Sequence, residues 1–314
     1  MKILVIRGGA IGDFILTLPA ISSLRSGLPK RITPEWRTVP RPLEILGYPR
    51  IAGIAVDSGL ADHIWHLESP SLASFFSQNG ILDKKQVEFF SKFDLIVSYL
   101  FDPERIFERN VLRCTSARFI RAPHRPDEHS NKYAADVFLE PVHSLGIVPP
   151  IQPILKFPEN ISAQQHYSGF LAAHPGSGSK SKNWPEENWK KLLTLVTENT
   201  RWNMLLTGGE AEEERVLRLA KTLPENRVEL ALNLPLSELA CRMRYCRGFV
   251  GHDSGITHLA AAVGGQGIVL WGSTSKQIWH PLSDHFHILE DAGGLENLSV
   301  ETVLAAINKK YGTG

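Results

Sequence analysis

The chain opens with the stretch that decides its fold, ILVIRGGAIGD at residues 3–13. Four consecutive apolar residues, 3–6, are typical of a strand buried on both faces of a parallel sheet. Glycines at 8, 9 and 12 favour a tight turn, and apolar residues then recur with helical spacing over 14–24. Pro19 falls inside this helix and is expected to kink it or to leave the Ile15 carbonyl unpaired. The opening therefore predicts a strand, a glycine-rich turn and a helix, as in a Rossmann-like domain.

The same alternation of strand and helix continues along the chain, more regularly in its second half. Patterning predicts strands at 51–56, 64–67, 94–99, 170–173, 203–207, 228–232, 249–250 and 268–271. It predicts helices at 71–78, 84–91, 212–222, 236–245 and 255–263, one beginning at Pro185, and a last one from Ser299 to Ile307. A proline-rich span from Val148 to Gln164 indicates a linker. We expect an α/β protein with two Rossmann-like domains, 1–157 and 158–314, facing each other across a cleft.

Composition narrows the class of protein. The 314 residues carry 34 Lys plus Arg and 33 Asp plus Glu, so a net charge of +1 does not indicate a nucleic-acid partner. Three cysteines make no disulfide framework and no His or Cys cluster near them completes a metal site. The apolar run before Arg7 is too short for a signal peptide or a membrane span. The expectation is a cytoplasmic protein, and contact with a membrane surface stays open.

Asp13 stands where the first turn becomes a helix. The glycines before it do not have the spacing of a dinucleotide-binding turn, and no clear acidic residue closes a second strand about 20 residues later. A carboxylate at a helix start is commonly an N-cap. The mouth of a cleft is also where a general base would be placed, so both interpretations are open.

Three further motifs lie in the second half. AHPGSGSKSKNWP at 173–185 combines glycines, serines and lysines before a helix and indicates a phosphate cradle, with a solvated loop as the alternative. GHDSGITHLAAA at 251–262 indicates a second anion site, in which Asp253 could accept hydroxyl groups of a sugar and His258 is either packed or catalytic. TGGEAEEER at 207–215 could hold a ribose, or could be a helix start rich in Glu.

These motifs together resemble the ADP-heptose:lipopolysaccharide heptosyltransferases, glycosyltransferase family 9. The resemblance rests on Gly12-Asp13 with TLPA at 17–20, on HPG at 174–176 with KNWP at 182–185, and on DSGITHL at 253–259. It implies a GT-B fold with the nucleotide sugar mainly on the second domain and the acceptor on the first. It also implies that the final helix crosses back onto the first domain.

The resemblance implies an inverting enzyme that needs no metal or other cofactor. It would move a heptose-type sugar from ADP-heptose to a lipopolysaccharide-core acceptor, a glycan carried on a lipid. The alternatives are another donor or acceptor, including a protein, or a nucleotide-dependent oxidoreductase or epimerase. The basic residues Arg118, Arg121, His124 and Arg125 could meet an anionic acceptor, could lie at the inner membrane, or could form a solvated loop.

Site roles follow from the resemblance, position by position. Asp13 matches the general base, Lys182 the lysine at the nucleotide phosphates, and Glu212 the acid near the ribose. The expected substrate-binding residues are Gly12, Ser177, Gly178, Ser179, Glu212, Asp253, Ser254, Gly255, Thr257, His258 and Ser273. One departure is the sequence Gly-Ser-Thr at 272–274, where the family commonly has Gly-Pro-Thr.

Overall fold

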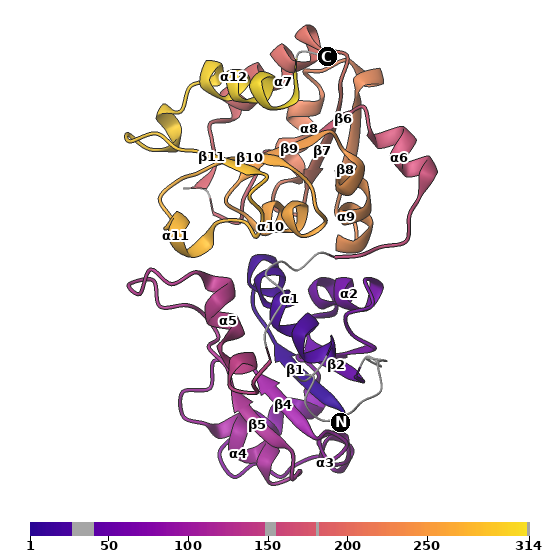
Figure 1. The fold of residues 1–314 in the computed structure, drawn as a ribbon, viewed down its shortest axis with the longest axis vertical. Helices are drawn as coiled ribbons and strands as arrows, with labels where there is room; N and C mark the ends of the chain where they lie inside the picture. The colour runs from indigo at the N-terminus through magenta and orange to yellow at the C-terminus, as the bar shows by residue number, and fades with distance from the viewer. Residues whose placement is uncertain (27–40, 148–154, 180–181, 313–314) are drawn as a thin grey trace. The chain divides into compact units, whose positions relative to one another are not determined.

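The computed structural model describes residues 1–26, 41–147, 155–179 and 182–312 and divides the chain into two compact units, Met1–Pro153 and Ile154–Gly314 (Figure 1). The predicted boundary after residue 157 lies slightly too late. Leu155 is buried and its N–H donates to the carbonyl of Ala262, and the Phe157 carbonyl accepts a hydrogen bond from Arg244. These contacts tie residues 155–157 to the second unit.

The first unit is a five-stranded parallel sheet with helices around it. Its strand order is β3-β2-β1-β4-β5, with β1 (Ile3–Arg7) in the centre. The other strands are β2 (Leu43–Gly47), β3 (His63–His66), β4 (Leu95–Ser98) and β5 (Arg118–Arg121). The helices are α1 (Ile11–Ser26), α2 (Pro49–Asp57), α3 (Lys84–Phe90), α4 (Ile106–Leu112), α5 (Ala134–His143) and the 3-10 helix η1 (Pro70–Phe76). All of β1 is buried, as its apolar run predicted.

One prediction for this unit needs correction. The segment 51–56 is not a strand but part of α2, which begins with Pro49 in its first turn and buries Ala52, Ile54 and Ala55 on one side. The strand beside β1 is instead β2, whose register pairs Val5 with Ile45. Pro19 lies inside α1, as predicted, and the helix continues to Ser26.

The second unit is a six-stranded parallel sheet in the order β11-β10-β9-β6-β7-β8. Its strands are β6 (Phe170–His174), β7 (Asn203–Gly208), β8 (Val228–Leu232), β9 (Gly248–His252), β10 (Gly267–Leu270) and β11 (Phe286–Leu289). Its helices are α6 (Ile161–Tyr167), α7 (Glu186–Asn199), α8 (Glu213–Ala220), α9 (Leu236–Tyr245), α10 (Gly255–Ala262), α11 (Lys276–Trp279) and α12 (Val300–Tyr311). Two short 3-10 helices are η3 (Glu225–Arg227) and η4 (Leu295–Asn297).

The last helix, α12, lies beside α7 (Figure 1). Its buried side chains Val303 and Ile307 join the core of the second unit, and the Tyr311 hydroxyl donates to the Gln266 carbonyl at 3.2 Å. Val300 and Tyr311 are buried in the same core, so these side chains of α12 pack within the second unit.

Strand order explains why distant motifs meet. Strands β10, β9, β6 and β7 are consecutive neighbours in one parallel sheet, so their carboxyl ends share one edge. The loops that follow them begin after Leu270, His252, His174 and Gly208, respectively. All three motifs predicted in the second half of the chain are thereby brought to this edge.

Candidate functional site

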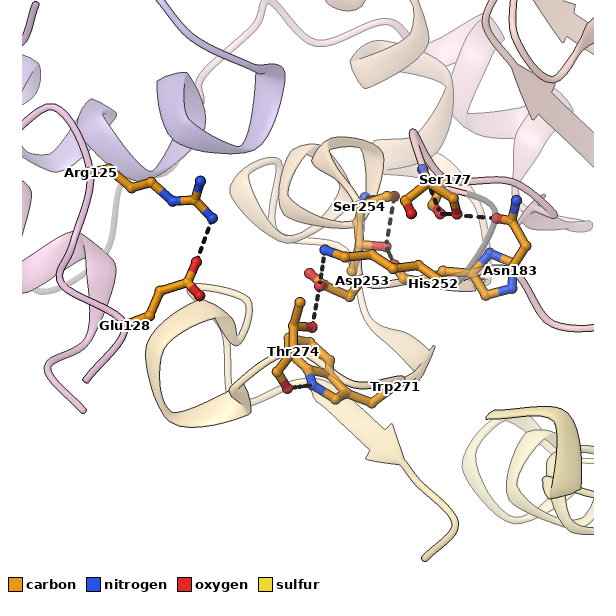
Figure 2. Close-up of polar contacts among 12 residues, drawn as sticks. Arg125, Glu128, Ser177, Asn183, His252, Asp253, Ser254, Trp271 and Thr274 are labelled. Carbon is orange, nitrogen blue, oxygen red and sulfur yellow. Dashed lines mark hydrogen bonds and ion pairs between the residues drawn. The ribbon is translucent and has the colours of Figure 1, made fainter. Parts of the chain in front are cut away.

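Asp253 is the centre of the polar cluster at the edge of the second sheet (Figure 2). Its carboxylate follows β9, is 8% exposed, and accepts a hydrogen bond from Lys182 Nζ at 2.8 Å. The same oxygen, Oδ2, accepts the Thr274 hydroxyl at 2.6 Å. Residues from the loops after β6, β9 and β10 thus converge on one carboxylate, and a lysine ammonium is held 30% exposed beside it.

His252, the last residue of β9, forms hydrogen bonds with the loop after β6. Its Nε2 accepts the backbone N–H of Trp184 at 2.9 Å, so Nδ1 carries the proton and donates to the Gly176 carbonyl at 3.2 Å. Burial lowers the pKa of the imidazole to about 3. His252 is therefore neutral near pH 7 and positions the loop that carries Lys182.

The loop after β6 is shaped by its own polar groups. The buried Ser177 hydroxyl lies 2.8 Å from the Ser179 carbonyl and 2.9 Å from Asn183 Oδ1 (Figure 2). Gly178 is exposed and Ser179 is half-buried. Three residues of this loop were predicted to bind substrate. The Ser177 hydroxyl bonds to groups of the loop itself, whereas Gly178 and Ser179 are more exposed to solvent.

Helix α10 begins at the same edge. Ser254 caps it, since its Oγ accepts the Thr257 N–H at 3.4 Å. The Thr257 hydroxyl donates to the His252 carbonyl, and His258 is buried one turn into the helix. Gly255 is the first helical residue. The arrangement directs the positive end of a helix dipole to the edge that carries Lys182, as an anion site requires.

Glu212 lies at the start of α8 and closes the cluster beside β7. Its Oε2 accepts the Gly209 N–H at 3.0 Å, and its side-chain stem packs on Gly176. Arg215, one turn on, donates to the Pro175 carbonyl at 3.1 Å. The acidic motif and the HPG motif are therefore in direct contact, as a shared ligand site would need.

Ser273 and its neighbour Thr274 differ in exposure and in what they contact. It is exposed, whereas the adjacent Thr274 is half-buried and supplies the hydroxyl that bonds to Asp253. The Trp271 indole N–H donates to the Thr274 carbonyl at 2.7 Å and holds this turn (Figure 2). Sequence reasoning missed Thr274, Asn183 and His252, although each is adjacent in sequence to a residue that it named.

Asp13 lies in the first turn of α1, after Gly12, with its carboxylate 25% exposed. Oδ2 accepts the Ala10 N–H at 3.2 Å and Oδ1 lies 3.9 Å from the guanidinium of Arg7. Gly9 adopts a φ of +100°, and a Cβ there would stand 3.0 Å from Asp13 Oδ2. The turn therefore leaves the carboxylate both tethered and open to one side.

Arg7 is 2% exposed and fixes this turn from within the unit. It donates to the carbonyl of Asp13 at 3.1 Å and to that of His124 at 2.8 Å, and its guanidinium lies 4.5 Å from the centre of the Phe138 ring. Burial lowers the pKa of Arg7, and the nearby Asp13 carboxylate opposes that shift. The two residues form a charge pair at the carboxyl end of the central strand.

The Asp13 carboxylate opens into a pocket of about 550 Å³ within the first unit. The lining includes Arg7, Asp13, Tyr48, Phe76, Phe101 and His124. This is a cavity with one ionised pair at its base and aromatic walls, which suits a substrate with both hydroxyl groups and apolar faces.

Two arginines of the predicted basic cluster lie close to carboxylates, which offset part of its positive charge. Arg121 lies 3.7 Å from the buried Glu108 carboxylate, and Arg125 forms an ion pair with Glu128 (Figure 2). Arg118 begins β5 and is exposed. Nearby Arg7 and Arg125 add to burial in lowering the pKa of His124.

Among the described residues, no three His, Cys, Asp or Glu side chains are grouped so that they could bind a metal ion. In the same residues, every helix is too short or too polar to span a bilayer.

The chain is similar to known glycosyltransferases. Residues 153–303 match the model of glycosyltransferase family 9 (heptosyltransferase). Lipooligosaccharide heptosyltransferase 2 of Haemophilus influenzae is 34% identical over 114 residues, 35% of this chain and 32% of that protein. The chain thus aligns with about a third of that relative's length. Lipopolysaccharide heptosyltransferase 3 of Escherichia coli is 20% identical over 96% of this chain and 90% of its own length.

The fold agrees as well. The structure of Escherichia coli ADP-heptose lps heptosyltransferase II superposes with a TM-score of 0.76, at 14% identity, over 99% of this chain and 98% of that one. The two parallel-sheet units therefore make a GT-B fold. The residues that match glycosyltransferase family 9 make up nearly all of the second unit, and the chain is similar to heptosyltransferases of that family.

Proposed function

We propose that this protein is an inverting glycosyltransferase that moves heptose from ADP-heptose to a lipopolysaccharide-core acceptor. The observation that carries the proposal is the convergence of Lys182, Asp253 and Thr274 at the start of α10, in the unit that matches family 9. Relatives with full-length or fold-level similarity are named for lipopolysaccharide heptose transfer, which supports the choice of sugar and acceptor.

The second unit would bind the donor. A nucleoside diphosphate at the edge of β6 and β9 would meet the Lys182 ammonium and the free N–H groups at the start of α10. Both stabilise the negative charge that grows on the diphosphate as the bond to the sugar breaks. We propose that these groups suffice without a metal ion, and that Glu212 and Asp253 accept hydroxyl groups of the donor.

The first unit would bind the acceptor and supply the base. Asp13 takes the proton of the acceptor hydroxyl as that oxygen attacks the anomeric carbon, and the diphosphate leaves from the opposite face. Arg7 donates to the backbone carbonyl of Asp13 and lies 3.9 Å from its carboxylate, so a buried cation holds the proposed base in place.

The first experiment tests which nucleotide the protein binds and which sugar it transfers. We expect ADP to raise the unfolding temperature more than UDP or GDP does, since a ligand that binds only the folded chain stabilises it by mass action. We then expect heptose transfer from ADP-heptose to a heptose-free lipopolysaccharide core, with turnover retained in EDTA. A strong preference for UDP, or for NAD, would contradict the proposal and favour another donor or an oxidoreductase. On this proposal the protein acts at the cytoplasmic side of the inner membrane.

A further inference from the structure

A second pocket lies directly beside the one that contains Asp13. It has a volume of about 560 Å³ and lies at the carboxyl ends of β4 and β5, where Ser98 and Arg121 are the last strand residues. The two pockets share Leu100, Phe101 and His124 as lining residues. The shared residues make the second pocket an extension of the first.

Phe101 is the most exposed aromatic side chain at this junction. It is 71% exposed, although it belongs to the wall of both pockets, and its ring lies 4.7 Å from the His124 ring at a tilt of 55°. Phe76, on the wall of the Asp13 pocket only, is 46% exposed and packs on Phe107. A single exposed apolar residue needs no explanation, but two aromatic rings lining a pocket with an ionised pair indicate a binding surface.

The chemistry of the second pocket suits a sugar ring. One face of a pyranose is a set of C–H bonds, which stacks on an aromatic ring much as another apolar face would. The hydroxyl groups at the rim of such a ring need polar partners. Arg121, Asp102 and Glu140 line the second pocket. The Asp102 carboxylate accepts backbone N–H groups at the start of α4, so the Arg121 guanidinium and the Glu140 carboxylate are the charged groups left to meet the sugar.

We propose that Phe101 is the platform for the second sugar of the acceptor. The sugar that bears the attacking hydroxyl occupies the Asp13 pocket, and the next sugar of the glycan stacks on Phe101 and places its hydroxyl groups in the second pocket. The favoured substrate is then a glycan of at least two linked sugars, and a single sugar is a poorer acceptor because it lacks the contact with Phe101. This inference rests on the proposed function and deepens its acceptor side.

The test compares two acceptors that differ only in length. We would measure kcat/KM for heptose transfer to a heptose-free lipopolysaccharide core and to the terminal sugar of that core as its methyl glycoside. We expect Phe101→Ala to lower kcat/KM about tenfold for the core, the size of a lost stacking contact, and to leave the methyl glycoside within about twofold. Phe101→Tyr, which keeps the ring, should retain the value for the core.

Two controls separate this role from others. Ile81→Ala removes another exposed apolar side chain of the first unit, one outside both pockets, and should change neither acceptor. Unfolding temperature should be the same for all three variants. Equal losses with both acceptors, or no loss with the core, would overturn the inference while leaving the proposed function intact. A wild-type chain that transfers no heptose to either acceptor would overturn both.

Discussion

In each unit the candidate site lies at the carboxyl ends of the parallel strands, but the polar groups there are arranged differently. At the carboxyl ends of β6, β9 and β10, the polar side chains form hydrogen bonds with one another. The Asp253 carboxylate, for example, accepts hydrogen bonds from both Lys182 and Thr274. At the carboxyl end of β1, Asp13 has a buried cation on one side and an open pocket with exposed aromatic rings on the other.

This difference matches what each unit would bind. A diphosphate is a compact anion, which a preformed set of charges and N–H groups recognises well. A glycan is bulky, and its attacking hydroxyl must reach a base that is not already saturated with donors. The second unit is therefore built to hold charge and the first to admit a substrate. Four changes test this comparison.

Asp13→Asn should have the largest effect. The amide keeps the shape of the carboxylate but cannot take a proton, so we expect turnover to fall about 10²- to 10⁴-fold while ADP binding is retained. Steady-state kinetics and calorimetry with ADP check both halves. Asp57→Asn, at an exposed position on α2, is the matched control. Normal turnover in the Asp13 variant would remove the first unit from the chemistry.

Lys182→Ala should affect both binding and rate. It deletes the ammonium and leaves the 8% exposed Asp253 carboxylate with the Thr274 hydroxyl still donating to it. We expect ADP affinity to drop about 10- to 100-fold, the value of a charged hydrogen bond, and turnover to fall as well. Lys190→Ala, exposed on α7, should leave both unchanged. Unaltered ADP affinity in the Lys182 variant would refute a charge-binding second unit.

Acid should weaken the second unit through His252. Its folded pKa is about 3 and its unfolded value about 6.5, so only the unfolded chain gains a proton between these values. The stability from a neutral His252 is complete above pH 6.5 and declines as the pH falls, by about 2 kcal/mol at pH 5. Burial lowers the pKa of His174 too, which adds in the same direction.

Urea unfolding at pH 7.5, 6 and 5 measures this loss. We expect His252→Asn to have a shallower dependence on pH than the natural chain, because it removes the titrating group. His287→Gln, at an exposed position of β11, should keep the full dependence. A His252 variant with the same slope as the natural chain would show that other groups cause the loss.

The smallest effect should come from Thr274. Thr274→Val removes one hydroxyl donor to Asp253, and we expect a loss of about 1 kcal/mol in the free energy of unfolding and a severalfold weaker affinity for ADP. Ser273→Ala next to it should be neutral. If the two substitutions exchanged these outcomes, the site would include Ser273, as the sequence had suggested.

Much of the second unit follows from its sequence, and α9 has the predicted bounds of 236–245. There, apolar runs of strand length alternate with capped helices, so periodicity and turn residues agree. The first unit is harder, because the apolar residues of 51–56 fit either a strand or the buried side of a helix. Pro49 in the first turn favours the helix that the structure has. Because 51–56 was predicted as a strand, the real strand β2 was not predicted.

The site shows the same division. Asp13, Lys182 and Asp253 could be named because charged residues after strands are conspicuous in a parallel α/β chain. His252 and Thr274 could not, because their roles depend on which backbone or carboxylate group each one meets across loops. The choice between Ser273 and Thr274 turns on the direction of one side chain, which depends on how Trp271 holds the turn.

The space around Gly176 limits which substitutions this sequence can accept in evolution. Its φ is not in the left-handed region, yet a Cβ at this position would lie 2.1 Å from Cγ of Glu212. The glycine is required by space and not by backbone conformation. A side chain at 176 would therefore require the Glu212 side chain to move or to become smaller, which couples two positions that are 36 residues apart by number.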